Sequence, residues 1–194
     1  MDSHSLLEQP SPWVRRFAPL IASGEVLDLA CGGGRHARFL ASLGHAVLAI
    51  DRDETALARA AGHGIKTAQC DLESEDADKS KNWPFQEERF QGIVVTNYLH
   101  RPLFAPILNS LAPGGILIYE TFAIGNERFG KPSNPDFLLQ PGELLKITQA
   151  TAQSMFHVVA FEDGYMDLPK PAMVQRICLC KLGREGMGER LLSI

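Results

Sequence analysis

Hydrophobic residues follow two kinds of pattern along this chain. Short continuous runs, such as residues 46–50, are typical of strands covered on both faces, whereas other stretches repeat apolar residues every three to four positions, as helices do. The two patterns alternate. We expect strands at residues 25–30, 46–50, 65–70, 90–96 and 116–121, with helices at residues 35–43, 54–61, 102–111 and 142–150. This alternation predicts an α/β fold built on a parallel sheet.

Both ends of the chain extend the pattern. Ser11 is a favourable cap, and Pro12 a favourable first residue, for an N-terminal helix within residues 1–23. Strands expected at residues 156–161 and 174–182 are joined by a connection too short for a crossover helix, so they should pair antiparallel. We therefore predict a Rossmann-like, doubly wound, seven-stranded sheet that is mostly parallel, with an antiparallel last strand and helices on both faces.

Three stretches fall outside the alternation. We expect residues 1–194 to form a single domain, with a polar surface loop at residues 74–82 and a flexible tail at residues 183–194. Residues 123–140 contain glycines, prolines and asparagines with no helical or strand period. So long an irregular segment is typical of a lid over a binding site, the alternative being a solvated loop.

The candidate lid carries an aromatic residue, Phe129, between the cations Arg128 and Lys131, which suits a small anionic or planar substrate. We expect the first helix to form the other wall of the substrate site. The candidate substrate-contacting residues are Trp13, Arg16, Phe122, Asn126, Arg128 and Phe129.

Composition narrows the class of protein. The chain has 194 residues, 45% of them hydrophobic, and a net charge of −4, which argues against a protein that grips nucleic acid by its phosphates. No apolar run reaches the roughly 18 residues needed to span a membrane, and the N-terminus lacks a signal-peptide pattern. The spacing of the four cysteines matches no zinc site or disulfide framework. We expect a cytoplasmic protein with no bound metal, no nucleic-acid partner and no membrane partner.

Three carboxylates stand where predicted strands end. Asp28, Asp51 and Asp71 are spaced by about one strand–helix repeat, so a parallel sheet would bring all three to its carboxyl edge. Open α/β sheets bind their ligands at that edge. Such a row of acids suits a ligand with several hydroxyl and amino groups and little negative charge.

A glycine-rich turn follows the first predicted strand. The pattern from Gly32 through Gly34 to Ala37 fits the dinucleotide fingerprint, in which glycines let the backbone approach a ligand at a helix N-terminus. Asp28, just upstream, would repel a pyrophosphate and attract a ligand that carries an ammonium and a sulfonium group. These residues therefore favour S-adenosylmethionine over a nicotinamide dinucleotide.

The stretch VLDLACGGGR, residues 26–35, resembles motif I of the class I S-adenosylmethionine-dependent methyltransferases. Ala30 stands where the family has its first glycine, and alanine fits there if its backbone torsion is negative. The acid after the second strand, the Cys70-Asp71-Leu72 segment, Asn97-Tyr98 and the Pro-Gly-Gly turn at residues 113–115 also resemble the family in order. The likeness covers about residues 24–122.

This resemblance implies roles for the strand-end residues. Asp51 would hold the ribose hydroxyls and Asp71 the adenine amine, although a helix cap, a loop carboxylate and, for Asn97, a turn former are the alternatives. The cofactor-binding residues implied are Asp28, Ala30, Cys31, Gly32, Gly34, Arg35, Asp51, Arg52, Asp71, Leu72, Asn97 and Tyr98.

Within the family, the chain is similar to small bacterial enzymes of the tellurite-resistance type, which act on small molecules or ions. The expected reaction is in-line methyl transfer to a small-molecule acceptor, for which proximity supplies most of the catalysis. Tyr98, His100 and Glu120 are candidate catalytic residues, each with a structural alternative. The sequence leaves the acceptor atom and the oligomeric state open.

Other functions fit parts of the pattern. A nicotinamide-dependent oxidoreductase would use the same turn, and a non-enzymatic S-adenosylmethionine-binding protein would use the same acids. An RNA or protein methyltransferase is disfavoured by the acidic composition and the lack of an appended binding domain.

Overall fold

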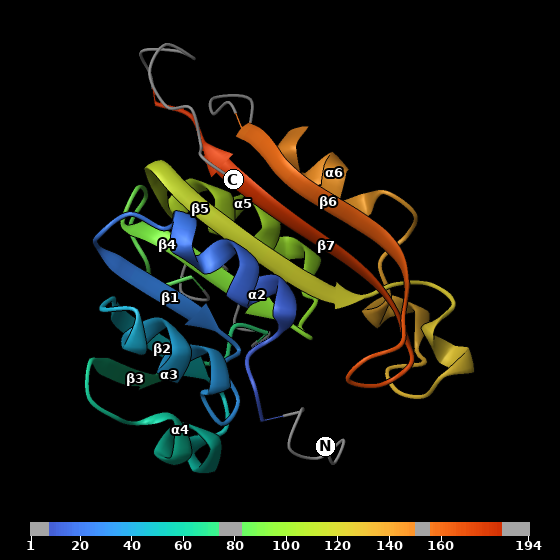
Figure 1. The fold of residues 1–194 in the computed structure, drawn as a ribbon, viewed down its shortest axis with the longest axis horizontal. Helices are drawn as coiled ribbons and strands as arrows, with labels where there is room; N and C mark the ends of the chain where they lie inside the picture. The colour runs from blue at the N-terminus through green and yellow to red at the C-terminus, as the bar shows by residue number, and fades with distance from the viewer. Residues whose placement is uncertain (1–7, 74–82, 150–155, 184–194) are drawn as a thin grey trace.

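In a computed structural model, which describes residues 8–73, 83–149 and 156–183, seven strands form one sheet in the order β3-β2-β1-β4-β5-β7-β6 (Figure 1). The loop expected at residues 74–82 and most of the expected tail lie outside the described residues. The strands are β1 Glu25–Leu29, β2 Ala46–Asp51, β3 Ile65–Gln69, β4 Phe90–Thr96, β5 Leu111–Phe122, β6 Phe156–Met166 and β7 Ala172–Lys181.

The pairing directions confirm the predicted topology. Strands β1 to β5 pair in parallel, whereas β7 runs antiparallel to both of its neighbours, β5 and β6. The chain moves outward from β1 to β3 and then crosses back to β4, so the strand order reverses between β1 and β4. A crevice is expected at the carboxyl ends of these two strands, where ligands bind in open α/β sheets.

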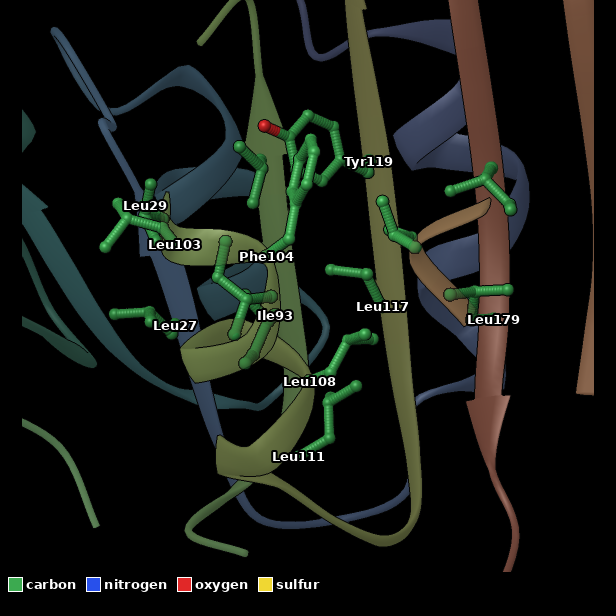
Figure 2. Packing of buried hydrophobic residues seen from close by; sticks show 14 of the residues in the cluster. Leu27, Leu29, Ile93, Leu103, Phe104, Leu108, Leu111, Leu117, Tyr119 and Leu179 are labelled. Carbon is green, nitrogen blue, oxygen red and sulfur yellow. The ribbon is translucent and has the colours of Figure 1, made fainter. Parts of the chain in front are cut away.

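Helices cover both faces of the sheet, as predicted (Figure 1). Because side chains alternate along a strand, Val26, Val47 and Val94 face one helical layer, whereas Leu27 and Ile93 face the other (Figure 2). None of the helices in the described residues is long and apolar enough to cross a membrane. The first layer is α2 Pro12–Phe17, α3 Arg35–Ser42 and α4 Glu54–Ala60, and the second is α5 Phe104–Ser110 and α6 Glu143–Lys146.

Several elements differ in length from the sequence prediction. The helix expected at residues 142–150 is a single α-helical turn, α6, followed by the 3-10 turn Ile147–Gln149. Two β-branched residues, Ile147 and Thr148, follow α6 directly, and their low helix propensity disfavours a longer helix. Strand β5 begins at Leu111, earlier than expected, with a shift of register against β4 near the Pro-Gly-Gly turn.

The first helix begins where the sequence predicted. Its cap is Ser11, whose hydroxyl accepts a hydrogen bond from the Trp13 backbone N–H at 3.1 Å. The Ser11 backbone N–H in turn donates to His36 Nε2 at 3.2 Å, and His36 Nδ1 lies 3.3 Å from the Thr96 hydroxyl. His36 is buried, and it therefore joins α2, α3 and the end of β4 below the crevice.

Because buried His36 stays neutral in the folded protein, the free energy of unfolding should depend on pH. Burial, aided by the nearby Arg35, lowers the pKa of His36 to about 3, against 6.5 in the unfolded chain. The unfolded state thus binds the extra proton first, and stability is lost as pH falls below 6.5. Between pH 8 and pH 5 the His36→Gln variant should gain about 2 kcal/mol relative to the wild type in urea unfolding.

The exposed His63 supplies the control for this measurement. A His63→Gln variant should keep the wild-type pH profile. Parallel profiles for the wild type and His36→Gln would show that His36 is not the residue responsible.

Candidate functional site

Two neighbouring cavities open at the carboxyl edge of the sheet. The smaller, of about 120 Å³, is lined by the ends of β2 and β3 and by the turn after β1. The larger, of about 400 Å³, is lined by the chain before α2, the ends of β4 and β5, the segment 126–131 and the β6–β7 connection. Asn97 lines the larger cavity and the next residue, Tyr98, lines the smaller. The two cavities therefore adjoin at the reversal of strand order.

The turn after β1 depends on left-handed backbone. Gly34 has φ 76°, and a Cβ added there would lie 2.5 Å from the Ala60 Cβ, so glycine lets α3 and α4 pack closely. Gly32 has φ 52°, and an added Cβ would meet open space. Ala30 has φ 54°, so the condition of a negative torsion, under which alanine fits without strain, is not met. Alanine instead holds a conformation that costs roughly 1–2 kcal/mol.

Asp28 is a carboxylate buried in the sheet beneath this turn. It is 1% exposed and accepts a hydrogen bond from the Ala37 backbone N–H, but its Oδ2 has no hydrogen-bond partner among the described residues. Burial raises the pKa of Asp28 to about 7, against the smaller opposing effects of Ala37 and the Arg35 guanidinium. A buried carboxylate with an unpaired oxygen is costly, and a cationic ligand group would offset this cost.

Asp51 organises the turn from the neighbouring strand. Its Oδ2 accepts from the Gly32 backbone N–H at 2.8 Å, and its Oδ1 accepts from the Asp53 backbone N–H at 3.0 Å. Asp53, and not Asp51, caps α4 by accepting from the Thr55 and Ala56 backbone N–H groups. Each Asp51 oxygen keeps capacity for a further donor, such as a hydroxyl group.

The smaller cavity gathers several of the predicted residues. Tyr98 lines it, and the side chain of Tyr98 hydrogen-bonds to Glu73. Burial and the charge of Glu73 raise the pKa of Tyr98, so the phenol stays neutral. Tyr98 is not among the described residues lining the larger cavity. The other predicted cofactor residues at the smaller cavity are Ala30, Asp51, Arg52, Asp71 and Leu72.

Glu120, at the end of β5, lines the larger cavity although it is only 6% exposed. The Ser11 hydroxyl donates to its carboxylate, and Arg176 Nη1 lies 3.4 Å from its Oε2. That ion pair is not aligned as a hydrogen bond, so Oε2 has no hydrogen-bond partner among the described residues. Burial raises the pKa of Glu120, opposed by Ser11, Arg176 and Arg35. The group combines an available acceptor oxygen with an increased affinity for a proton.

The first helix does form a wall of the larger cavity, through residues other than the two predicted. Trp13 is buried, and its Nε1 donates to the Ile177 carbonyl at 3.3 Å. Arg16 instead lies over the Phe17 ring, 4.9 Å from its centroid. Neither residue is among the described residues that line the cavity; Ser11, Pro12 and Arg15 are.

The segment 123–140 is fastened at both ends. Ala123 forms a bridge with the buried Leu139, and the Asn126 side chain donates to the Pro132 carbonyl at 3.0 Å and accepts from the Met173 backbone N–H at 3.3 Å. Asn126 is thus both a brace and part of the cavity lining. The segment is a looped wall with closed ends, of the kind that often serves function.

Of the other predicted site residues, some line the larger cavity and some do not. Phe122, Asn97, Arg35 and Phe129 line the larger cavity. Arg128 lies over the Phe129 ring at 5.7 Å and is absent from the described lining, as is His100, which precedes a 3-10 turn.

Arg101 follows His100 and begins the 3-10 turn after β4. It holds the candidate lid from outside the cavity, since it donates to Glu143 at 2.7 Å and to the Leu138 carbonyl at 2.9 Å.

Sequence reasoning also missed one whole wall of the larger cavity. The β6–β7 connection contributes Met166 and residues 168–172, and Lys131 joins them from the segment 123–140. Figure 1 shows this connection beside the yellow 123–140 segment, and the Phe129 and Tyr165 rings lie 5.3 Å apart across them. The prolines at positions 169 and 171 marked a turn in the sequence but carried no sign of which site it would face.

Comparison with known proteins finds relatives among methyltransferases. Residues 26–115, a little less than half of the chain, match the family model described as a methyltransferase domain. A protein-L-isoaspartate O-methyltransferase from Chlorobaculum tepidum is 32% identical over 108 residues, which are 56% of this chain and 49% of the relative. The match thus spans about half the length of that curated methyltransferase.

Solved structures share the fold of this methyltransferase domain. An S-adenosylmethionine-dependent methyltransferase from Mesorhizobium loti gives a TM-score of 0.64 at 19% identity, over 87% of this chain and 96% of that one. TehB from Haemophilus influenzae gives 0.69 at 19% identity, over 90% of this chain and 63% of that one. The fold is that of class I methyltransferases, whose cofactor is S-adenosyl-L-methionine.

The residues around the glycine-rich turn fit S-adenosyl-L-methionine. The unpaired Asp28 Oδ2 suits a cationic amine, the open space beside Gly32 admits a ligand against the backbone, and Asp51 offers acceptors for hydroxyl groups. A row of acids beside the turn would repel a diphosphate. These acidic side chains therefore suit a positively charged nucleoside better than a dinucleotide.

Replacing Asp51 tests the ribose assignment. Asp51→Ala should weaken binding of S-adenosylhomocysteine by roughly 1–3 kcal/mol, because charge-assisted hydrogen bonds to the ligand are lost. Calorimetric titration measures this. Asp53→Ala is the matched control, since it removes only the α4 cap; it should lower stability by about 1 kcal/mol and leave the affinity unchanged. Equal affinities for the Asp51 variant and the wild type would refute the assignment.

Proposed function

We propose that this protein transfers a methyl group from S-adenosylmethionine to a small-molecule acceptor. The observation that carries the proposal is the adjoining pair of cavities where the strand order reverses. The smaller is lined by Asp51, Asp71 and Ala30 of the turn after β1, which suit a nucleoside, and the other is a larger, mainly apolar space with one buried carboxylate. Asn97 and Tyr98 stand between them, where the two reactants would meet.

Each side of the site has a distinct part. Asp51 and Asp71 would hold the hydroxyl and amino groups of the adenosine, while Asp28 would pair with the ammonium of the methionine portion. When bound, S-adenosylmethionine supplies a methyl group on a positively charged sulfur, a carbon already activated for displacement. The protein then mainly needs to place the acceptor in line and to exclude water.

Glu120 would act as the general base that accepts the proton of the acceptor group. Its Oε2 has no hydrogen-bond partner among the described residues, and burial raises its pKa, so it binds a proton more readily than an exposed carboxylate does. With the cofactor bound, Glu120 would take the proton that an acceptor hydroxyl or amine loses when it is methylated. The proton then leaves to solvent through the mouth of the cavity.

Two measurements test the proposal. Calorimetric titration should show binding of S-adenosylhomocysteine and none of NAD; the reverse result would favour a nicotinamide-dependent oxidoreductase. A screen of hydroxyl, amine, thiol and metalloid acceptors, read by release of S-adenosylhomocysteine, should then show turnover. Cofactor binding without turnover on any acceptor, isoaspartyl peptides included, would favour a non-enzymatic binding protein.

A further inference from the structure

Three cations stand at the mouth of the larger cavity. Arg15 comes from α2, Lys131 from the segment 123–140, and Lys170 from the β6–β7 connection, and all three side chains are exposed. Within the described part of the chain, none of these side chains has an ion pair or a hydrogen bond. Segments far apart in the sequence thus bring unneutralised positive charge to one opening.

This positive charge contrasts with the whole protein. The chain carries a net charge of −4, yet four cations line this cavity, including Arg35, against the single acid Glu120 among its described lining residues. Glu120 is also deeply placed and paired with Arg176. A cavity lined by one sign of charge raises the local concentration of ligands of the opposite sign.

The space between the mouth and Glu120 is mainly apolar. Its lining consists of aliphatic, aromatic and proline side chains from α2, β5, β6, β7 and both loop walls. They are Pro12, Phe122, Phe129, Met166, Leu168 and Val174. A ligand that fills this space therefore has an apolar body, and its polar groups lie at its two ends.

On the basis of the proposed function, we infer that the acceptor is an organic acid: a small molecule with an apolar body and a carboxylate group. Arg15, Lys131 and Lys170 hold the carboxylate at the mouth, and the group to be methylated lies at the other end, beside Glu120. The cofactor brings only one carboxylate of its own, so three cations on three separate walls exceed what it needs. These cations thus determine which acceptors are selected.

Binding of matched acids and esters tests the inference without requiring turnover. The probes are 4-hydroxybenzoate and 3-phenylpropionate, each compared with its methyl ester, titrated into the full chain saturated with S-adenosylhomocysteine. The triple variant Arg15→Gln, Lys131→Gln, Lys170→Gln should weaken binding of the acids about tenfold, since each exposed charge contributes modestly. It should leave binding of the esters and of S-adenosylhomocysteine unchanged.

A control variant changes the charge equally, away from the cavity. Arg16→Gln, Lys66→Gln, Lys146→Gln removes three exposed cations that are not among the described lining residues, and should bind the acids as the wild type does. The inference is overturned if acids bind no better than esters, if both triple variants lose affinity equally, or if the mouth variant loses S-adenosylhomocysteine instead. Acid binding that depends on the mouth cations, without turnover of 4-hydroxybenzoate, would show that the cavity selects organic acids and would count against their being methyl acceptors.

Discussion

Replacing Asp28 by asparagine is expected to make the ligand-free protein more stable and the cofactor complex weaker. Above pH 7, the folded wild type holds a buried charge whose pKa of about 7 lies far above the unfolded value of 3.8, a difference on the order of 4 kcal/mol. Asparagine removes the charge but leaves its own buried N–H groups without an acceptor. The net gain at pH 8 should be about 2 kcal/mol, or roughly 6 °C in Tm.

The pH dependence of the stability gain from Asp28→Asn provides an internal control. Well below the unfolded pKa of 3.8 both states of the wild type carry protonated Asp28, so Asp28→Asn should give no advantage there. As pH rises, the unfolded chain ionises first and the wild type loses stability until the folded pKa is passed. The gain from Asp28→Asn should therefore grow from pH 4 to pH 7 in urea unfolding. A gain of equal size at pH 4 and pH 8 would refute the buried-charge explanation.

The same variant should lose affinity for S-adenosylhomocysteine by roughly tenfold to a hundredfold. In the proposed complex, the carboxylate that destabilises the ligand-free protein would pair with the ligand's ammonium group, and a charge-assisted hydrogen bond of this kind contributes about 1.5–3 kcal/mol. Calorimetric titration at pH 8 measures the loss. Unchanged affinity would show that Asp28 does not contact the ligand.

Replacing Glu120 by glutamine is expected to lower kcat by about a hundredfold to a thousandfold for acceptors that lose a proton. The change keeps the shape of the side chain and removes its basicity. Because the pKa of Glu120 is raised, the wild-type rate should increase with pH through that elevated value, and Glu120→Gln should lose this limb of the pH profile. Affinity for S-adenosylhomocysteine should stay unchanged, since Glu120 lines only the larger cavity.

Glu162 offers a matched control for Glu120. Both carboxylates neighbour Arg176, at 3.4 Å and 3.5 Å, but Glu162 lies half-exposed on β6 and does not line the cavity among its described residues. Glu162→Gln should keep nearly full activity. If it lowered kcat as strongly as Glu120→Gln, the effect would arise from the charge balance of Arg176 and not from proton transfer.

The fold could be predicted because the sequence patterns that indicate it each lie within a short stretch of the chain. Continuous apolar runs gave β1, β2 and β4, and a short connection between two late runs gave the antiparallel pair of β6 and β7. Helix ends were less secure where tertiary contacts decide them. The single turn of α6, whose Leu144 backbone N–H donates to the Gln175 side chain, is one example.

Part of the smaller cavity could be predicted from topology. Asp51 ends β2 and Asp71 follows β3, so both line the cavity at the carboxyl edge, whereas Asp28 is buried within β1. The acceptor side could not be predicted. Arg15, one position from the predicted Arg16, lines the cavity because of the angle at which α2 packs, which no periodicity reveals. Lys170 lies on a turn whose position depends on the pairing of β6 with β7.

Much of the wall of the larger cavity comes from segments outside the β1–β4 edge. These segments are residues 9–11 before α2, the tip of the 123–140 segment and the β6–β7 turn. Substitutions or insertions in these three segments can thus alter which acceptor is recognised, while the proposed binding site of the methyl donor is preserved. The architecture is modular, and new substrate ranges can evolve on it, or be engineered into it, one wall at a time.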